Sequence, residues 1–144
     1  MKLALVQICS GDNPAKNLEK TCTFIREAAR AGAELIVTPE VTNCVSQSRD
    51  HQRQVLQTEA QDLTLAQLRK LAEQERIWLL SGSLALKNTG PCDRFSIRSF
   101  LVDPQGQIQT RHDKIHMFDV TLSSSESYKE SDGYKPGDRA VLSK

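Results

Sequence analysis

The sequence has little net charge, few cysteines and no long apolar run at its N-terminus, and each shortage excludes a class of protein. Its 144 residues carry 19 Lys and Arg against 18 Asp and Glu, a formal net charge of +1. Proteins that bind nucleic acid through a basic surface normally have clustered Lys and Arg and a pI above about 9. A membrane helix needs about 20 apolar residues. We therefore expect no nucleic-acid partner and no membrane association.

The cysteines are too sparse for a disulfide scaffold. They form no C-x-x-C pair and are Cys9, Cys22, Cys44 and Cys92. Reduced thiols in a cytoplasm are the simplest interpretation, and the N-terminus lacks the cleavage site of a signal peptide. A hydrophobic content of 38% indicates part of one globular domain rather than a disordered chain. We expect a cytoplasmic location.

The first part of the chain alternates short apolar runs with an amphipathic segment. Residues 1–8 predict a strand. A helix is predicted over 14–32, because this segment begins at an Asp-Asn-Pro cap, ends at a glycine and has apolar residues at helical spacing. The apolar run 35–37 predicts a second strand, which a Thr-Pro pair ends. This strand delivers Glu40 at its C-terminal end.

The rest of the chain continues the pattern. A polar loop that could cover a site is expected over 42–51, followed by a helix over 64–76 and a strand over 77–80. Residues 94–102 and 107–111 predict two strands joined by an Asp-Pro-Gln-Gly turn, and the serine run near 124 predicts a short loop. This order predicts an α/β layered fold with a mixed sheet.

Two charged side chains are candidates for chemistry by their position. Glu40 follows a predicted strand, where open α/β folds assemble their sites. Lys114 lies just after another strand, in the densely alternating segment 112–119. Taken singly, each has a plainer interpretation, Glu40 as a solvated loop carboxylate and Lys114 as a surface charge. Neither residue alone justifies a mechanism.

Three segments together resemble the carbon-nitrogen hydrolase, or nitrilase, superfamily. They are the apolar run ending in Thr-Pro-Glu40, the segment Asp-Lys114-Ile-His-Met-Phe-Asp-Val, and Tyr-Lys-Glu130-Ser with the Pro-Gly-Asp that follows it. Within the superfamily, the chain most resembles the branch of deaminated glutathione amidase and omega-amidase. The resemblance implies an α-β-β-α sandwich, of which residues 1–144 supply an N-terminal half with one sheet face and one edge exposed. Such a half is expected to be marginally stable or to associate.

The resemblance also implies a mechanism. A Glu-Lys-Cys triad hydrolyses a small carboxylated amide through a thioester and releases ammonia, without a cofactor. Glu40 would be the general base and Lys114 would stabilise the oxyanion. Glu130 would be a supporting carboxylate that positions Lys114 and substrate, with a plain loop charge as its alternative. A glutaminase-like or carbamoylase relative would differ only in substrate, and full-length family members are expected to form homo-oligomers.

The family's nucleophilic cysteine is expected on a strand-to-helix turn after the Pro-Gly-Asp segment, beyond Lys144. All four cysteines precede Lys114, so none of them matches the nucleophile. Cys44 is a competitor, because it lies in a loop four residues after Glu40. We expect this chain alone to be inactive. The alternative is a non-catalytic domain that binds a small acid, or that pairs with a partner chain through exposed sheet surface.

Other chemistries find little support. His112 and His116 have a spacing that suits zinc on a helix, but no third ligand is evident and the segment follows a strand. No metal site is therefore predicted. The Ser-Gly-Ser at 81–83 lacks the G-x-S-x-G pattern of a nucleophile elbow. Because no glycine-rich phosphate loop is present, no nucleotide cofactor is expected.

Overall fold

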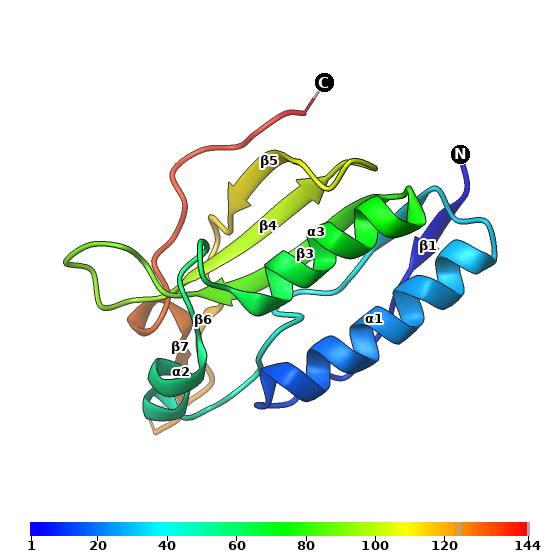
Figure 1. The fold of residues 1–144 in the computed structure, drawn as a ribbon. Helices are drawn as coiled ribbons and strands as arrows, with labels where there is room; N and C mark the ends of the chain where they lie inside the picture. Colours follow the sequence, from blue (N-terminus) through cyan, green and yellow to red (C-terminus); the bar gives the residue numbers. More distant parts are fainter. Residues whose placement is uncertain (124, 144) are drawn as a thin grey trace.

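A computed structural model describes residues 1–123 and 125–143 as a five-stranded mixed sheet with two long helices on one face (Figure 1). The sheet order is β1-β2-β3-β4-β5. Its strands are β1 (Leu3–Leu5), β2 (Leu35–Val37), β3 (Trp78–Leu86), β4 (Ser96–Val102) and β5 (Ile108–Asp113). The first three strands are parallel and the last two pair antiparallel. The predicted α/β fold with a mixed sheet is confirmed.

The two long helices begin where the sequence offers caps. In α1 (Pro14–Arg30), the side chain of Asn13 accepts the N–H of Lys16, and the proline occupies the first turn, where its missing N–H costs nothing. In α3 (Leu63–Glu75), the Asp62 carboxylate accepts the N–H of Leu65 at 2.7 Å. Both helices agree with their predicted ranges to within one or two residues.

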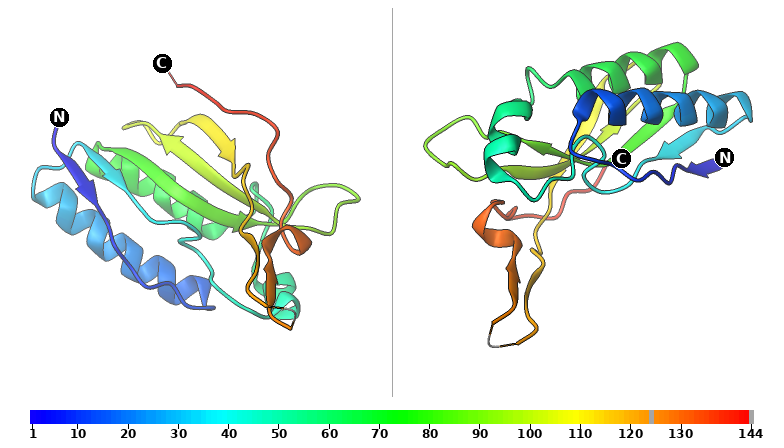
Figure 2. Two further views of the ribbon diagram at one scale, coloured as in Figure 1. Left: turned by 180° about the vertical axis from the view of Figure 1, so that it is seen from behind. Right: turned by 90° about the horizontal axis from the view of Figure 1, so that it is seen from below.

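The core lies between the sheet and these helices. Ile36, Leu79 and Phe100 come from three different strands, are fully buried, and pack in one cluster with side chains of α1 and α3. Within the described part of the chain, no helix covers the other face of the sheet (Figure 2, left). The side chains of Leu3 and Leu5, on the edge strand β1, are 52% and 74% exposed.

Three local predictions were wrong. The first strand is Leu3–Leu5 rather than 1–8, so Cys9 lies beyond it and is exposed. The third strand runs to Leu86 instead of ending at 80, with a register irregularity between Ser81 and Leu84. The predicted loop is confirmed over 42–48 and wrong over 49–51, where α2 (Arg49–Val55) begins, a helix too short and polar for its periodicity to be recognised.

A further element follows β5 and was not predicted. β6 (Asp119–Thr121) and β7 (Ser127–Lys129) form a hairpin, and a 3-10 helix, η1 (Glu130–Asp132), follows it. The hairpin stands away from the sheet on the side opposite α1 and α3 (Figure 2, right). The loop expected near residue 124 falls on a position outside the described residues. In residues 1–123 and 125–143, no helix is long and apolar enough to cross a membrane.

Candidate active site

The structure brings the three sequence-predicted site residues together from distant parts of the chain. The Nζ atom of Lys114 lies 2.7 Å from Oε1 of Glu40 and 2.8 Å from Oε2 of Glu130. The side chains become more exposed in the order Glu130 (19%), Lys114 (27%) and Glu40 (55%). The ammonium therefore sits between a sheltered carboxylate and a more accessible one.

The turn after β2 that carries Glu40 is strained and is held by β3. The residue after it, Val41, has φ 50°, a left-handed conformation that is uncommon for a β-branched residue. Its N–H donates to Oγ of Ser83 at 2.8 Å, and the N–H of Thr42 donates to the Ser83 carbonyl at 2.9 Å. Such strain persists only where the surroundings impose it, and here one serine of β3 binds both amides.

Gly82 lets this turn approach β3. A Cβ atom at this position would lie 2.1 Å from the carbonyl oxygen of Thr38 and 2.7 Å from that of Pro39, far inside contact distance. The Gly82 N–H instead donates to Oγ1 of Thr38 at 3.3 Å. Sequence reasoning missed this residue, although a glycine inside a strand commonly marks a close approach of another backbone.

The main chain of Lys114 is fixed from two sides. Its N–H donates to the Ile97 carbonyl at 2.8 Å, and its own carbonyl accepts the N–H of Gly137 at 2.8 Å. A Cβ on Gly137 would lie 2.4 Å from the carbonyl oxygen of Asp113. The Pro-Gly-Asp segment singled out in the sequence therefore lies directly against the backbone that carries the lysine.

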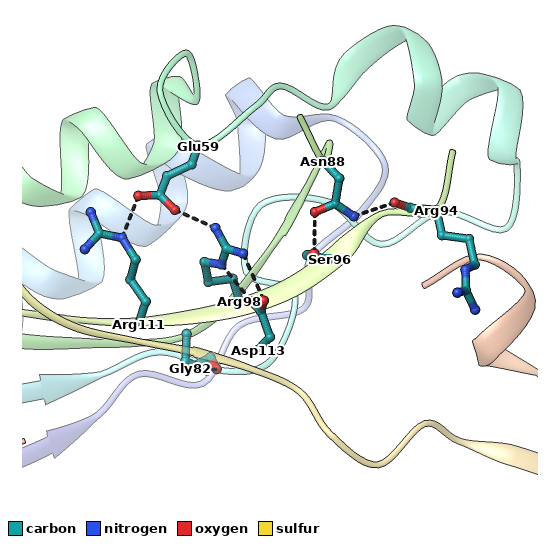
Figure 3. Close-up of polar contacts among 9 residues, drawn as sticks. Glu59, Gly82, Asn88, Arg94, Ser96, Arg98, Arg111 and Asp113 are labelled. Atoms are coloured by element: carbon teal, nitrogen blue, oxygen red, sulfur yellow. Dashed lines mark hydrogen bonds and ion pairs between the residues drawn. The ribbon is translucent and has the colours of Figure 1, made fainter. Parts of the chain in front are cut away.

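An ion-pair network braces the end of β5 on the helix side of the sheet (Figure 3). Arg98 donates from Nε and Nη2 to the two oxygens of Asp113, at 2.6 and 2.9 Å. Its Nη1 donates to Glu59, which also accepts from Nε of Arg111, both at 2.7 Å. Because Asp113 directly precedes Lys114, the two bonds from Arg98 to Asp113 hold the strand just before the lysine.

Glu130 links Lys114 to the root of the β6–β7 hairpin. Its Oε2 accepts the N–H of Phe118 at 2.6 Å while the carboxylate contacts the ammonium. Burial alone would lower the pKa of Lys114, but hydrogen bonds from Lys114 to Glu130 and Glu40 outweigh burial and hold that pKa above its ordinary value. The lysine therefore keeps its positive charge at neutral pH.

A hollow of about 370 Å³ opens beside Glu40 and Lys114, on the face of the sheet that the helices leave bare. This volume lies in the range of small-molecule sites, roughly 300–1,000 Å³. Its other lining residues are Gly82, Ser83, Ile97, Ser99, His112, Ile115 and His116. At one wall, the carboxylate can exchange a proton with a small polar molecule. The ammonium beside it can hold a negative oxygen of the same molecule.

The two histidines line this hollow without forming a metal site. Among residues 1–123 and 125–143, no group of three His, Cys, Asp or Glu side chains is arranged to hold a metal ion. His112 pairs with Ser99 across the two antiparallel strands, and His116 lies beyond the strand end. Together they add imidazole groups to the wall of the hollow.

None of the four cysteines lines the hollow. Cys44 is fully buried in a second apolar cluster with Phe95 and Ile97. Its Sγ lies 3.5 Å from the carbonyl oxygen of Asp12, and burial raises the pKa of this thiol. Cys44 is therefore a protonated core residue, and its nearness to Glu40 in sequence does not make it a nucleophile.

Comparison with protein families identifies the chain. The family model of carbon-nitrogen hydrolases matches residues 2–143, and the chain belongs to this family. It is 31% identical over 141 residues to deaminated glutathione amidase of Yersinia enterocolitica, covering 97% of this chain and 49% of that protein. It is 28% identical over 144 residues to omega-amidase NIT2 of Mus musculus, covering 95% and 48%. The resemblance to this branch is confirmed.

Solved structures agree with the fold. An amidase from Nesterenkonia superposes with a TM-score of 0.78 at 25% identity, covering 99% of this chain and 52% of that one. The NitFhit protein of C. elegans superposes with a TM-score of 0.86 at 23% identity, covering 96% and 34%, which shows the fold alone. The chain spans about half the length of the curated relatives it matches. The chain therefore has the nitrilase-type fold over the part of those structures that it matches.

Proposed function

We propose that Glu40, Lys114 and Glu130 are the acid–base part of an amidase site that hydrolyses a small carboxylated amide, such as deaminated glutathione, through a cysteine thioester. The observation that carries this proposal is the Lys114 ammonium held between two carboxylates at the wall of a hollow. The names of the relatives support it, since they are deaminated glutathione amidase and omega-amidase. A mutant of the Nesterenkonia amidase has been solved with acrylamide added at the active-site cysteine.

Glu40 suits the role of proton carrier, because it is the most exposed of the three and lines the hollow. It takes the proton of the attacking thiol as the new carbon–sulfur bond forms. It returns this proton to the departing nitrogen when the carbon–nitrogen bond breaks and ammonia leaves. It then takes a proton from the water that attacks the thioester, and it gives this proton to the sulfur when the carbon–sulfur bond breaks, which releases the acid and restores the thiol.

Lys114 suits the role of oxyanion stabiliser. During both attacks, the carbonyl oxygen becomes negative, and a fixed positive charge beside it lowers the barrier most in a site that excludes water. The paired carboxylates keep the pKa of Lys114 above its ordinary value, so its charge stays in place through the cycle. Glu130 acts as the sheltered carboxylate that holds the ammonium while Glu40 exchanges protons.

The thiol is proposed to come from a residue outside 1–144, because none of the four cysteines lines the hollow. It follows that this chain alone supplies only part of the substrate site and releases no ammonia. Four free cysteines agree with a reducing cytoplasm. We also propose that the full-length protein forms a homo-oligomer, as the family resemblance implies.

The test measures ammonia release from deaminated glutathione and α-ketoglutaramate. We expect none from residues 1–144, and release from a polypeptide extended through the family's cysteine turn. Glu40→Gln should abolish the activity of the extended polypeptide, whereas Glu19→Gln, an exposed carboxylate on α1, should leave it unchanged. Ammonia release by residues 1–144 that disappears in Glu40→Gln would overturn the assignment of an external thiol. Full activity in the extended Glu40→Gln variant would overturn the role of Glu40.

A second candidate function is a non-catalytic domain that binds a small acid or pairs with another chain. The exposed Leu3 and Leu5 on the edge strand favour it, because unpaired edges and bare apolar faces are pairing surfaces. An extended polypeptide that folds, hydrolyses neither amide and still binds α-ketoglutarate in calorimetry would favour this function over the amidase.

A further inference from the structure

The β6–β7 hairpin is joined to the rest of the protein at its root, next to the site. Each strand has only three residues, and the two pair only with each other among the described strands. A two-stranded hairpin of this length is marginal in water by itself. The position of its root therefore depends on contacts made by side chains there.

Two carboxylates form these contacts from opposite sides of the root, Asp119 at the start of β6 and Glu130 at the start of η1. The carboxylate of Glu130 accepts the N–H of Phe118 from across the hairpin. The carboxylate of Asp119 reaches in the other direction, accepting the N–H of Ser131 at 3.0 Å and its hydroxyl at 2.6 Å. The two reciprocal contacts form a clasp, defined here as Phe118 and Asp119 with Glu130 and Ser131.

We propose that Asp119 is a positioning residue that holds Glu130 against the Lys114 ammonium by fixing the next residue, Ser131. This inference rests on the proposed function only in one respect, that the Lys114 charge stabilises an oxyanion. Among the described residues, no hydrogen bond or ion pair joins Asp119 to Lys114 or to a residue lining the hollow. Its effect on the site passes through the main chain from Ser131 to Glu130.

The clasp has a measurable consequence at Lys114. When Asp119 is removed, the Ser131 N–H and hydroxyl lose their acceptor. The root of the hairpin keeps its two bonds between Glu130 and Phe118, one from the carboxylate and one from the main chain, and the Ser131 carbonyl keeps its bond from Arg94. Glu130 then spends part of its time away from Lys114, which keeps Glu40 as its one partner. Burial, which lowers the pKa of Lys114, is then opposed by fewer carboxylate contacts, so that pKa falls.

Competitive acetylation with trace acetic anhydride, read at each lysine by mass spectrometry across alkaline pH, measures this directly on residues 1–144. In Asp119→Ala, we expect Lys114 to label about three- to tenfold faster at pH 9, which corresponds to a pKa lowered by about half to one unit. Asp119→Asn keeps one acceptor for the Ser131 N–H and should restore most of the original profile. Lysines on α1, remote from the clasp, should label unchanged.

Glu126→Ala is the matched control, because it removes a carboxylate of the same hairpin that contacts only the Tyr128 hydroxyl among the described bonds. It should not change the labelling of Lys114. Folding of each variant is checked by circular dichroism. If Asp119→Ala does not fold, Ser131→Ala, which removes one hydroxyl, decides the question through the same labelling.

A folded Asp119→Ala, or Ser131→Ala in its place, whose Lys114 profile matches that of the unaltered chain overturns the proposal. Faster labelling in Asp119→Ala that Asp119→Asn does not reverse also overturns it, because the effect would then come from the lost charge. The labelling needs no catalysis. A labelling shift in a protein whose extended form hydrolyses no amide therefore supports the clasp and refutes the amidase, so the two failures are distinguishable.

Discussion

The two faces of the five-stranded sheet are built on different principles. On the face covered by α1 and α3, alternate strand residues such as Ile36, Leu79 and Phe100 are fully buried in apolar contact. On the bare face, the neighbouring positions carry the hollow, where Ser99 and Lys114 are partly exposed. The same strands thus present buried apolar side chains to the helices and the residues lining the hollow to the other side, as the two-residue period of a strand allows.

This difference shows how the charged groups of the site are placed. Apolar packing fixes where the strands lie, and polar contacts at the strand ends fix where the charges lie. Glu40 depends on the hydrogen bonds of Ser83, and Lys114 on those of Ile97 and Gly137. The Arg98 network lies on the covered face, but it holds the end of β5, directly before Lys114.

The largest effect should come from breaking the covered face. Phe100→Ala removes a fully buried ring and should lower the free energy of unfolding by about 3–5 kcal/mol, because the cavity adds to the lost transfer energy. Urea unfolding followed by circular dichroism measures the change. Leu5→Ala, on the bare face, should stay within about 0.5 kcal/mol. Equal losses in the two variants would contradict the asymmetry of the two faces.

A smaller effect should come from the turn after β2 that carries Glu40. Gly82→Ala places a methyl group against the Thr38 and Pro39 carbonyls and should cost about 1–3 kcal/mol. It should also release the Val41 N–H from Ser83, which hydrogen exchange detects as lost protection. Gly11→Ala is the control, because no atom lies within 4 Å of the added carbon. Retained Val41 protection in Gly82→Ala would show that the turn does not depend on the glycine.

The covered face could be predicted from sequence because its signals are local. The caps at Asn13 and Asp62 and the apolar spacing of α1 and α3 act within one or two turns of helix. The run 35–37 is bounded by its own proline. For the same reason, Glu40 could be placed at a strand end without knowledge of any tertiary contact.

The bare face could not be predicted in this way, because its structure depends on contacts between distant segments. Nothing local in Ser83 indicates that it binds the Val41 N–H, nor that Asp119 binds Ser131. The meeting of Lys114 with its carboxylates followed from family resemblance and not from periodicity. The hairpin was missed because its three-residue strands carry too short a pattern to separate from loop.

The smallest of the three effects should come from the network that braces β5. Burial alone would raise the pKa of Glu59, but Arg111 and Arg98 outweigh it and hold that pKa below its ordinary value. The stabilisation is therefore present above the unfolded pKa, about 4.3, and is lost as pH falls through the lower folded value. Glu59→Gln should lower the free energy of unfolding by about 1–2 kcal/mol at pH 7, and the difference from the unaltered chain should shrink towards pH 3.

Asp50→Asn provides the matched control for this pH dependence. Asp50 pairs with Arg53 at 3.0 Å, but its side chain is 88% exposed, so the change should be under about 0.5 kcal/mol at any pH. A Glu59→Gln deficit that stays constant from pH 7 to pH 3 would mean that the carboxylate's charge contributes nothing. The brace at the end of β5 would then rest on Arg98 and Asp113 alone, and the covered face would support Lys114 through one ion pair instead of a shared network.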